Sequence, residues 1–248
     1  MTARQQRIKL IALDMDGTLL DENGEISEAN REAINQAQSE GIYVVLSTGR
    51  TIRTCSQYAE SLKLSSYLVT VNGSEIWGDR GELVERHMIH SDLIQWMYTL
   101  SQQHETSFWA VNTERVWREI MPNEITTCEW LKFGFDTDDQ AVREKLYKKL
   151  VNSNQLEISN SSPTNLEVNA KGINKARAIR RVCRNLDISM DDVMAVGDSL
   201  NDLAMITEAG YGIAMGNAQE TVKKAADFVT GTNIEDGVAE AIWKWVLE

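Results

Sequence analysis

Lys9-Leu-Ile-Ala-Leu-Asp-Met-Asp-Gly-Thr18 is a short apolar run that ends in two acidic residues and a glycine. Continuous apolarity, rather than alternation, is typical of a strand that is buried on both faces, as in a parallel sheet. Gly17 allows the backbone to turn away at the end of the strand. We therefore predict a buried strand over residues 9–15 that delivers Asp14 and Asp16 to one edge of a sheet.

The segments around this strand alternate between helical and strand patterns. Ser27 is suited to cap a helix that ends at Gly41, and apolar runs bounded by polar loops predict further strands. The expected strands cover residues 42–48, 67–71, 193–196, 211–215 and 228–230, and the expected helices lie near 55–62, 174–185, 200–209, 219–226 and the last residues. This alternation predicts an α/β fold with a Rossmann-like parallel-sheet core.

The middle of the chain changes character. Its predicted strands are shorter (107–111, 115–120, 130–135 and 156–159) and are interrupted by helical patterns at 91–100 and 139–151. We predict one discontinuous core domain, 1–83 and 168–248, interrupted by an inserted α+β cap domain, 84–167. This insertion holds four of the seven tryptophans, which we expect in its core; the alternative is that one of them faces the active site and selects a ring-bearing substrate.

Composition narrows the class of partner. The 248 residues include 37 acidic and 25 basic side chains, for a formal net charge of −12, which argues against a nucleic-acid polymer or an anionic membrane as partner. No apolar run approaches the roughly 18 residues of a membrane span, and we expect no secretory signal. Cys55, Cys128 and Cys183 are far apart, which favours reduced thiols and a cytoplasmic location. The oligomeric state is not fixed by these features.

Four predicted strand ends carry small polar residues: 14–18, 47–50, 72–74 and 197–202. Ligands of open α/β sheets bind outside the carboxyl ends of the strands, so these clusters are expected to converge. Residues two apart in an extended chain point the same way, so Asp14 and Asp16 can face one site. Two such carboxylates can act as nucleophile and general acid/base; the alternative is a turn with solvated acids.

The second acidic cluster is Gly197-Asp-Ser-Leu-Asn-Asp202. Its oxygen-bearing side chains suit a hard cation such as Mg²⁺, whereas helix capping alone would explain one of the acids but not the set. An EF-hand starting at Asp14 is disfavoured, because Leu19 occupies the loop position that needs glycine. Ser47-Thr-Gly-Arg50 can form an anion cradle or an ordinary helix cap. Either Lys171 or Lys175 could neutralise a phosphate oxygen.

Taken in order, these motifs strongly resemble those of the haloacid dehalogenase superfamily. The insertion and the segments Val71-Asn-Gly-Ser74 and Tyr211-Gly-Ile-Ala-Met-Gly-Asn217 resemble its Cof-type phosphatases, which carry an α/β (type C2) cap. The resemblance covers the core and is only topological in the cap.

The resemblance implies roles for individual residues. Asp14 would be the nucleophile that becomes an aspartyl phosphate, and Asp16 the general acid/base. Thr48 and Lys175 would hold phosphoryl oxygens. The implied Mg²⁺ ligands are Asp14, the Asp16 carbonyl and Asp198, with Asp202 supporting or ligating. The implied substrate-binding residues are Thr48, Asn72, Gly73, Lys175 and Asn201; we add Gly49 and Arg50, because the possible anion cradle places backbone N–H groups and a guanidinium there.

Two departures from the family pattern concern the lysine and the third motif. The family lysine usually precedes glycine, whereas Lys175 precedes Ala176 and Lys171 precedes Gly172. The spacing from the predicted helix back to Leu166-Glu-Val168 favours Lys175 as the family lysine. Ser74 follows Asn72-Gly73 where alanine is commoner.

We therefore expect a Mg²⁺-dependent phosphatase of small phosphorylated metabolites, either sugar phosphates or nucleotide- and flavin-related phosphates. One alternative is a phosphomutase or phosphotransferase that uses the same core. Another is a non-catalytic sensor that binds phosphate and metal.

Overall fold

The computed structural model describes residues 8–247, which form two compact units. One unit combines the chain as far as Val84 with the residues from Lys175 onward, and the other is Glu85–Asn174. The chain therefore leaves the first unit once and returns to it once. The division at 84–167 stays a prediction, and a boundary after residue 167 would fall inside a strand of the second unit.

The first unit is built on a sheet with the strand order β13-β12-β11-β1-β2-β3-β4-β5. Its strands are β1 (Leu10–Leu13), β2 (Tyr43–Ser47), β3 (Leu68–Thr70), β4 (Glu75–Trp77), β5 (Leu83–Arg86), β11 (Val193–Gly197), β12 (Tyr211–Ala214) and β13 (Phe228–Val229). The strands from β13 to β3 are parallel, and β4 runs antiparallel to β3. The α/β fold with a parallel-sheet core is confirmed.

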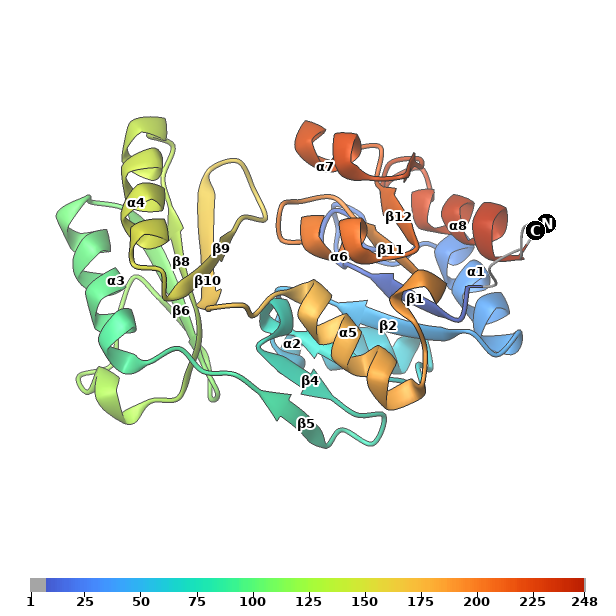
Figure 1. Ribbon diagram of the computed structural model, residues 1–248, viewed down its shortest axis with the longest axis horizontal. Helices are drawn as coiled ribbons and strands as arrows, with labels where there is room; N and C mark the ends of the chain where they lie inside the picture. Colours follow the sequence, from blue (N-terminus) through green and yellow to red (C-terminus); the bar gives the residue numbers. More distant parts are fainter. Residues whose placement is uncertain (1–7, 248) are drawn as a thin grey trace. The chain divides into compact units, whose positions relative to one another are not determined.

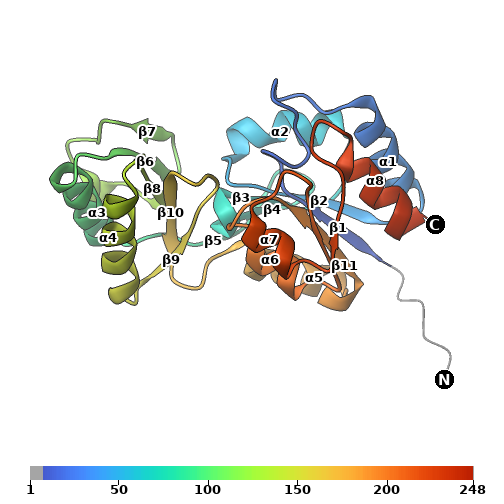
Figure 2. The same cartoon turned by 90° about the horizontal axis from the view of Figure 1, so that it is seen from above.

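Helices cover both faces of this sheet, as Figures 1 and 2 show. They are α1 (Glu28–Ser39), α2 (Ile52–Ser61), α5 (Lys175–Leu186), α6 (Leu203–Glu208), α7 (Glu220–Ala225) and α8 (Gly237–Ile242), which continues as a π-helical turn over Trp243–Leu247. In both views α1, α2 and α8 lie on one face and α5 and α6 on the other. Helices are needed on both faces because the strands carry apolar side chains toward both.

Strand β1 shows why the opening stretch fixes this architecture. Ile11 and Leu13 pack into the cluster with α1 and α8, whereas Leu10 and Ala12 pack into the cluster with α5. All four side chains are fully buried. Helices cover both faces of β1 along its whole length. The residues after Leu13 lie beyond this cover, at the carboxyl edge of the sheet.

The second unit is a five-stranded antiparallel sheet with the order β7-β6-β8-β10-β9. Its strands are β6 (Ser107–Asn112), β7 (Val116–Arg118), β8 (Trp130–Asp136), β9 (Leu156–Ser159) and β10 (Asn165–Ala170). Helices α3 (Ser91–Gln103) and α4 (Gln140–Asn152) cover one face in both Figures 1 and 2. Trp130 is fully buried in the core beneath them, Trp96 and Trp117 pack against that core, and the indole of Trp109 lies over Gly134.

Three strands, β4, β5 and β10, were not predicted from the sequence. β4 and β5 are short and follow a tight turn at the end of β3. β10 alternates polar and apolar residues, and its Glu167 is buried because it pairs with Lys132 of β8 at 3.1 Å. This alternation is typical of a half-buried strand, so β10 was predictable from the local pattern and was overlooked; its pairing with the distant Lys132 was not.

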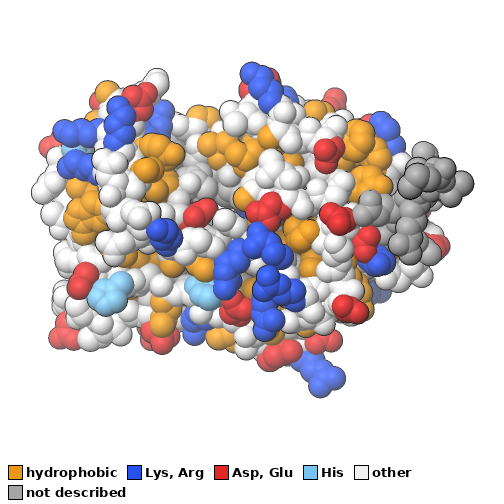
Figure 3. All heavy atoms as spheres, viewed as in Figure 1, with side chains coloured by type: hydrophobic (Ala, Val, Ile, Leu, Met, Phe, Trp, Pro, Cys, Tyr) orange, Lys and Arg blue, Asp and Glu red, His pale blue; other side chains and the backbone are white. Residues whose placement is uncertain are grey.

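Three further features concern the chain as a whole: the distribution of surface charge, the state of the cysteines and the length of the apolar helices. Figure 3 shows basic side chains gathered over α5, although the chain as a whole is acidic. Cys55 and Cys183 are buried free thiols, and burial raises the pKa of Cys55 to about 12. Among residues 8–247, no helix is long and apolar enough to span a bilayer.

Candidate active site

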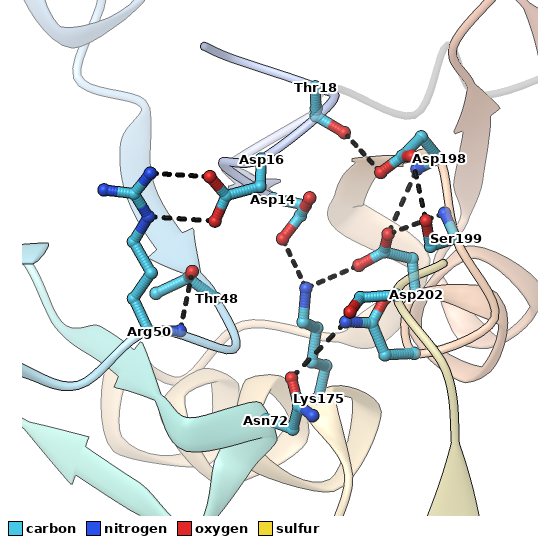
Figure 4. A network of polar contacts seen from close by, with 12 residues as sticks. Asp14, Asp16, Thr18, Thr48, Arg50, Asn72, Lys175, Asp198, Ser199 and Asp202 are labelled. Atoms are coloured by element: carbon cyan, nitrogen blue, oxygen red, sulfur yellow. Dashed lines mark hydrogen bonds and ion pairs between the residues drawn. The ribbon is translucent and has the colours of Figure 1, made fainter. Parts of the chain in front are cut away.

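Four loops meet at the carboxyl edge of the parallel sheet, together with the first residue of α5 (Figure 4). The loops follow β1, β2, β3 and β11. Polar side chains from all of them lie within one network, as the positions of the strand ends predicted. The site described below is formed entirely by residues of the first unit.

Lys175 is the centre of this network. Its ammonium donates to Asp14 Oδ1 at 2.5 Å and to Asp202 Oδ1 at 2.7 Å, and its side chain is completely buried. Although burial opposes the charged form, the two carboxylates raise the pKa of Lys175 above its ordinary value. The lysine is therefore a permanent positive charge at physiological pH.

The surroundings of Asp14 disfavour its charged form, whereas those of Lys175 favour the charged form. Burial, followed by the nearby charge of Asp202, raises the pKa of the Asp14 carboxyl well above its ordinary value. The contact with Lys175 only partly offsets these effects. A carboxylate that is desolvated but tethered by one cation is a reactive, positioned oxygen nucleophile.

Asp198 lies beside this pair and is held by two hydroxyl groups. Ser199 Oγ donates to Asp198 Oδ2 at 2.8 Å, and Thr18 Oγ1 donates to Asp198 Oδ1 at 3.4 Å. Burial, and next to it the charge of Asp202, raise the pKa of Asp198 to about 6. Gly17 has φ +78°, and a Cβ on it would lie 2.7 Å from Asp198 Oδ2. Glycine is required there both for its backbone conformation and for this close approach.

The three carboxylates fit a divalent cation. One oxygen of each of Asp14, Asp198 and Asp202 lies within 4.8 Å of the others. Burial first, and then the negative charge of Asp202, raise the pKa values of Asp14 and Asp198, so three acids beside one lysine leave unbalanced negative charge in a buried space. Hard oxygen ligands of this kind suit Mg²⁺. Of the three carboxylates, that of Asp202 already accepts the most hydrogen bonds: Oδ1 accepts from Lys175, and Oδ2 accepts from two backbone N–H groups.

Asp16 does not share these partners. Arg50 binds it through both carboxylate oxygens, with Nη2 at 2.6 Å from Oδ1 and Nε at 2.9 Å from Oδ2. The Asp16 side chain is 60% exposed, whereas that of Asp14 is nearly buried. Figure 4 shows the two carboxylates directed toward different cations. The two acids thus come from one loop as predicted, but their environments differ sharply.

Thr48 and Asn72 form the wall next to the lysine. Thr48 Oγ1 accepts from the Arg50 N–H at 3.1 Å, which leaves its hydroxyl proton available for another acceptor. Asn72 donates its backbone N–H to the Thr48 carbonyl, and Asn201 Nδ2 donates to Asn72 Oδ1 at 3.4 Å. Among the described residues, the buried Asn201 Oδ1 has no hydrogen-bond partner, so a donor on water or a ligand is needed there.

The loop after β3 has an unusual backbone. Val71, Asn72 and Gly73 all have positive φ, at 51°, 56° and 94°. Valine is strongly disfavoured in this left-handed region because it is β-branched. Hydrogen bonds from Val71 N to Arg50 O and from Asn72 N to Thr48 O hold the loop in place. Strain of this kind is typical of sites that must present backbone and side-chain groups to a ligand.

Of the two candidate lysines, the structure brings Lys175 to Asp14, while Lys171 donates to Asn154 of the second unit at 2.7 Å. The sequence analysis gave no role to Tyr58 or Asn217. Tyr58 contacts Arg50, and Asn217 Nδ2 donates to the Gly17 carbonyl at 2.8 Å. Asn217 stands in a quoted motif, but no local signal marks Tyr58, which lies on an ordinary amphipathic helix.

Comparison with known proteins agrees with this geometry. A family profile described as haloacid dehalogenase-like hydrolase matches residues 11–143 and 119–242. The chain is 58% identical to the 5-amino-6-(5-phospho-D-ribitylamino)uracil phosphatase YcsE of Bacillus subtilis (strain 168), over 97% of this chain and 96% of that protein.

Solved structures show the same fold. A haloacid dehalogenase-like hydrolase from B. subtilis superposes with a TM-score of 0.88 at 25% identity, covering 96% of this chain and 99% of that one. Another, from Bacteroides thetaiotaomicron, gives 0.80 at 31% identity, with coverage of 96% and 99%. Profile, relative and fold agree with the motifs at the sheet edge: the chain belongs to the haloacid dehalogenase-like hydrolases and is an enzyme of their Cof-type phosphatase group.

Proposed function

We propose that the enzyme hydrolyses small phosphorylated metabolites by way of an aspartyl phosphate on Asp14, with Mg²⁺ as cofactor. One observation carries this proposal. The Asp14 carboxylate is buried, fixed by Lys175 at 2.5 Å and placed beside two further acids. Such a group is poorly suited to a structural role, since burial raises its pKa, but it is well suited to attack phosphorus.

In the first step, an Asp14 oxygen attacks phosphorus and forms a new P–O bond. The bond from phosphorus to the leaving oxygen breaks, and that oxygen takes the proton of the Asp16 carboxyl. The alcohol departs, and the phosphoryl group stays on Asp14. Lys175, Thr48, Asn201 and the Gly49 and Asn72-Gly73 backbone regions bind the phosphoryl oxygens, which neutralises and positions the transferred group.

In the second step, water attacks the same phosphorus and gives a proton to Asp16. The P–O bond to Asp14 breaks, inorganic phosphate leaves, and the Asp14 carboxylate and the Asp16 acid are restored. Both steps need a proton carrier beside the reacting oxygen, and the first also needs a fixed nucleophile. The exposure of Asp16 beside the buried Asp14 suits this division of roles.

Asp14, Asp198 and the Asp16 carbonyl would hold the Mg²⁺, with Asp202 supporting them through its bonds to the loop. When bound, the cation would neutralise charge that develops on the phosphoryl oxygens. The residues fit the ion because they offer hard oxygens and a local excess of negative charge.

We expect EDTA to abolish activity and added Mg²⁺ to restore it, with a pH dependence set by Asp198. The pKa of this carboxyl is raised to about 6, so a proton competes with the cation below that pH. The apparent Kd for Mg²⁺ should be about tenfold higher at pH 5 than at pH 7.5. The increase in Tm caused by Mg²⁺ should therefore be larger at pH 7.5, which thermal unfolding measures without any assay of activity. A pH-independent Mg²⁺ effect would contradict the site.

For the substrate, we propose an aminopyrimidine that carries a ribityl phosphate, on the strength of the 58% identity to the phosphatase YcsE over nearly its whole length. The test is release of inorganic phosphate from a panel that includes 5-amino-6-(5-phospho-D-ribitylamino)uracil, glucose 6-phosphate and phosphoglycolate. We expect kcat/KM to be at least about tenfold higher for the first compound, because a site built for polar ring groups rejects substrates that lack them. A flat profile, or a preference for glucose 6-phosphate, would refute this assignment.

The same panel, extended by a generic aryl phosphate and by analysis of the organic products, separates the two alternative functions. A phosphomutase would produce an isomeric sugar phosphate in place of inorganic phosphate. A non-catalytic sensor would turn over no substrate, including a generic aryl phosphate.

Three broader statements complete the proposal. The partner is a small molecule and not a nucleic-acid polymer or a membrane, in keeping with the net charge of −12. The enzyme acts in the cytoplasm, where Cys55 and Cys183 stay reduced. The chain forms a core domain, proposed from the sequence as 1–83 and 168–248, with residues 84–167 as an inserted cap domain; the compact unit Glu85–Asn174 supports the insertion and favours a later end, after β10.

A further inference from the structure

Arg50 has two possible anionic partners at the active site: a phosphoryl group of the substrate, or the carboxylate of Asp16. In the structure, two of its nitrogens bind both oxygens of Asp16, at 2.6 and 2.9 Å. This fork-to-carboxylate geometry fixes the plane of the carboxyl group as well as its position, which a single contact does not do.

The Arg50 guanidinium has a second contact, with Tyr58. Its Nη1 donates to the Tyr58 hydroxyl at 3.4 Å, and its guanidinium lies over the Tyr58 ring at 5.3 Å from the centroid. The Tyr58 hydroxyl in turn donates to the Gly24 carbonyl at 3.0 Å, in the loop that follows the nucleophile segment. The chain of contacts thus runs from α2 to Asp16, and each of the three guanidinium nitrogens makes one of these contacts.

The contact leaves Asp16 able to do chemistry. An ionised carboxylate offers about four acceptor positions, and Arg50 occupies two of them. The remaining positions can meet a leaving oxygen or an attacking water. Because the Asp16 side chain is 60% exposed, its bare ion pair would contribute little to stability, so the second anchor at Tyr58 points to a purpose other than holding the fold together.

We infer that Arg50 and Tyr58 are positioning residues, which act through Asp16 by holding its carboxyl group in line for proton transfer and do not bind the phosphoryl group themselves. The inference rests on the proposed function, because it needs Asp16 as the proton carrier. It also assigns Arg50 differently from the prediction made from the sequence, which placed it among the substrate-binding residues.

The leaving group of the substrate provides the test. An alkyl phosphate such as glycerol phosphate needs a positioned acid to release its alcohol, whereas p-nitrophenyl phosphate releases an acidic phenol with little help. The parameter kcat/KM reports the steps up to loss of the leaving group, so it is measured for both substrates. Competitive inhibition by inorganic phosphate is measured in parallel, because it reports binding of the phosphoryl group alone.

For Arg50→Gln, we expect kcat/KM to fall by about 10- to 100-fold for glycerol phosphate and by less than about threefold for p-nitrophenyl phosphate. The inhibition constant for phosphate should stay within about twofold. Arg50→Lys should behave like Arg50→Gln, because an ammonium cannot bind both oxygens in a plane. Tyr58→Phe, which keeps the ring and removes the hydroxyl, should shift the ratio in the same direction by a smaller factor.

Two controls make the result specific. Arg53→Gln removes an exposed arginine from α2, the helix that carries Tyr58, and should change neither substrate's kcat/KM. On an Asp16→Asn background, Arg50→Gln should cause no further change in the ratio between the substrates, since its effect passes through Asp16.

Other results would overturn the inference. An equal loss for both substrates with weaker phosphate inhibition would mean that Arg50 binds the phosphoryl group. An unchanged or reversed ratio would mean that the contact is incidental. If the unaltered enzyme hydrolyses neither substrate, the proposed function itself fails, which is a distinct outcome. If Arg50→Gln does not fold, Tyr58→Phe decides by the same ratio.

Discussion

Replacing Asp14 by Asn is expected to lower kcat/KM for phosphate release by a factor of about 10⁴ or more, which corresponds to about 5 kcal/mol of transition-state stabilisation. The amide has nearly the shape of the carboxyl group but cannot form the new bond to phosphorus as an oxygen nucleophile. Its oxygen can still accept from Lys175, so the surrounding geometry should persist. Release of inorganic phosphate from p-nitrophenyl phosphate measures the effect.

The same substitution should leave the fold as stable as before, or more stable, when EDTA is present. The folded state holds the Asp14 carboxyl with a raised pKa, so its ionisation at pH 7.5 costs stability that a neutral amide does not cost. Thermal unfolding in EDTA should therefore show an equal or higher Tm for Asp14→Asn. Asp79→Asn, at an exposed position of the β4–β5 turn, is the matched control and should keep full activity. Near-normal phosphate release by Asp14→Asn would refute the nucleophile assignment.

The parts of this site that the sequence predicts are those set by the sheet. The continuous apolar run of β1 forces both faces of that strand to be buried, and its end then places Asp14 at the carboxyl edge. The same argument applies to β11 and Asp198. Lys175 is predictable because α5 must start near that edge to cover the sheet with its apolar face.

The parts that the sequence does not predict depend on contacts between distant residues. Spacing suggests that Asp14 and Asp16 face one site, but their partners, Lys175 and Arg50, come from different elements and draw them apart. Arg50 could bind either of two anions, and its contacts with Asp16 and Tyr58 become visible only in the folded chain. Val71 has a left-handed backbone that its side chain opposes, so no propensity argument finds it.

Lys175→Met is expected to lower kcat/KM by a factor of about 10³, since the lysine both fixes Asp14 and neutralises the transferred group. It should also destabilise the fold. Removing one partner from a fully buried ion pair costs about 3–5 kcal/mol, because the remaining charges stay desolvated. Lys171→Met is the matched control, because this lysine is exposed and contacts Asn154 only at its tip. Full activity of Lys175→Met would exclude it from the catalytic site.

The loss of stability in Lys175→Met should depend on pH in a definite direction. Without the lysine, nothing offsets the burial that already raises the pKa of the Asp14 carboxyl, so its folded-state pKa should rise further above the unfolded value of about 4. A carboxyl with a raised folded-state pKa favours the fold at low pH and opposes it as the pH increases. The difference in Tm from the unaltered enzyme should therefore be small near pH 5 and large near pH 8, in EDTA at both values.

A second substitution separates the electrostatic role of Lys175 from its catalytic role. Asp202→Asn on the Lys175→Met background removes one buried negative charge, while its amide oxygen can still accept from the N–H groups of Asp198 and Ser199. We expect the double variant to recover most of the lost Tm at pH 8 without recovering kcat/KM. This non-additivity in stability alone would show that charge balance holds the fold and that the ammonium itself is needed for phosphoryl transfer. If activity returned together with stability, Lys175 would act only by neutralising the buried acids.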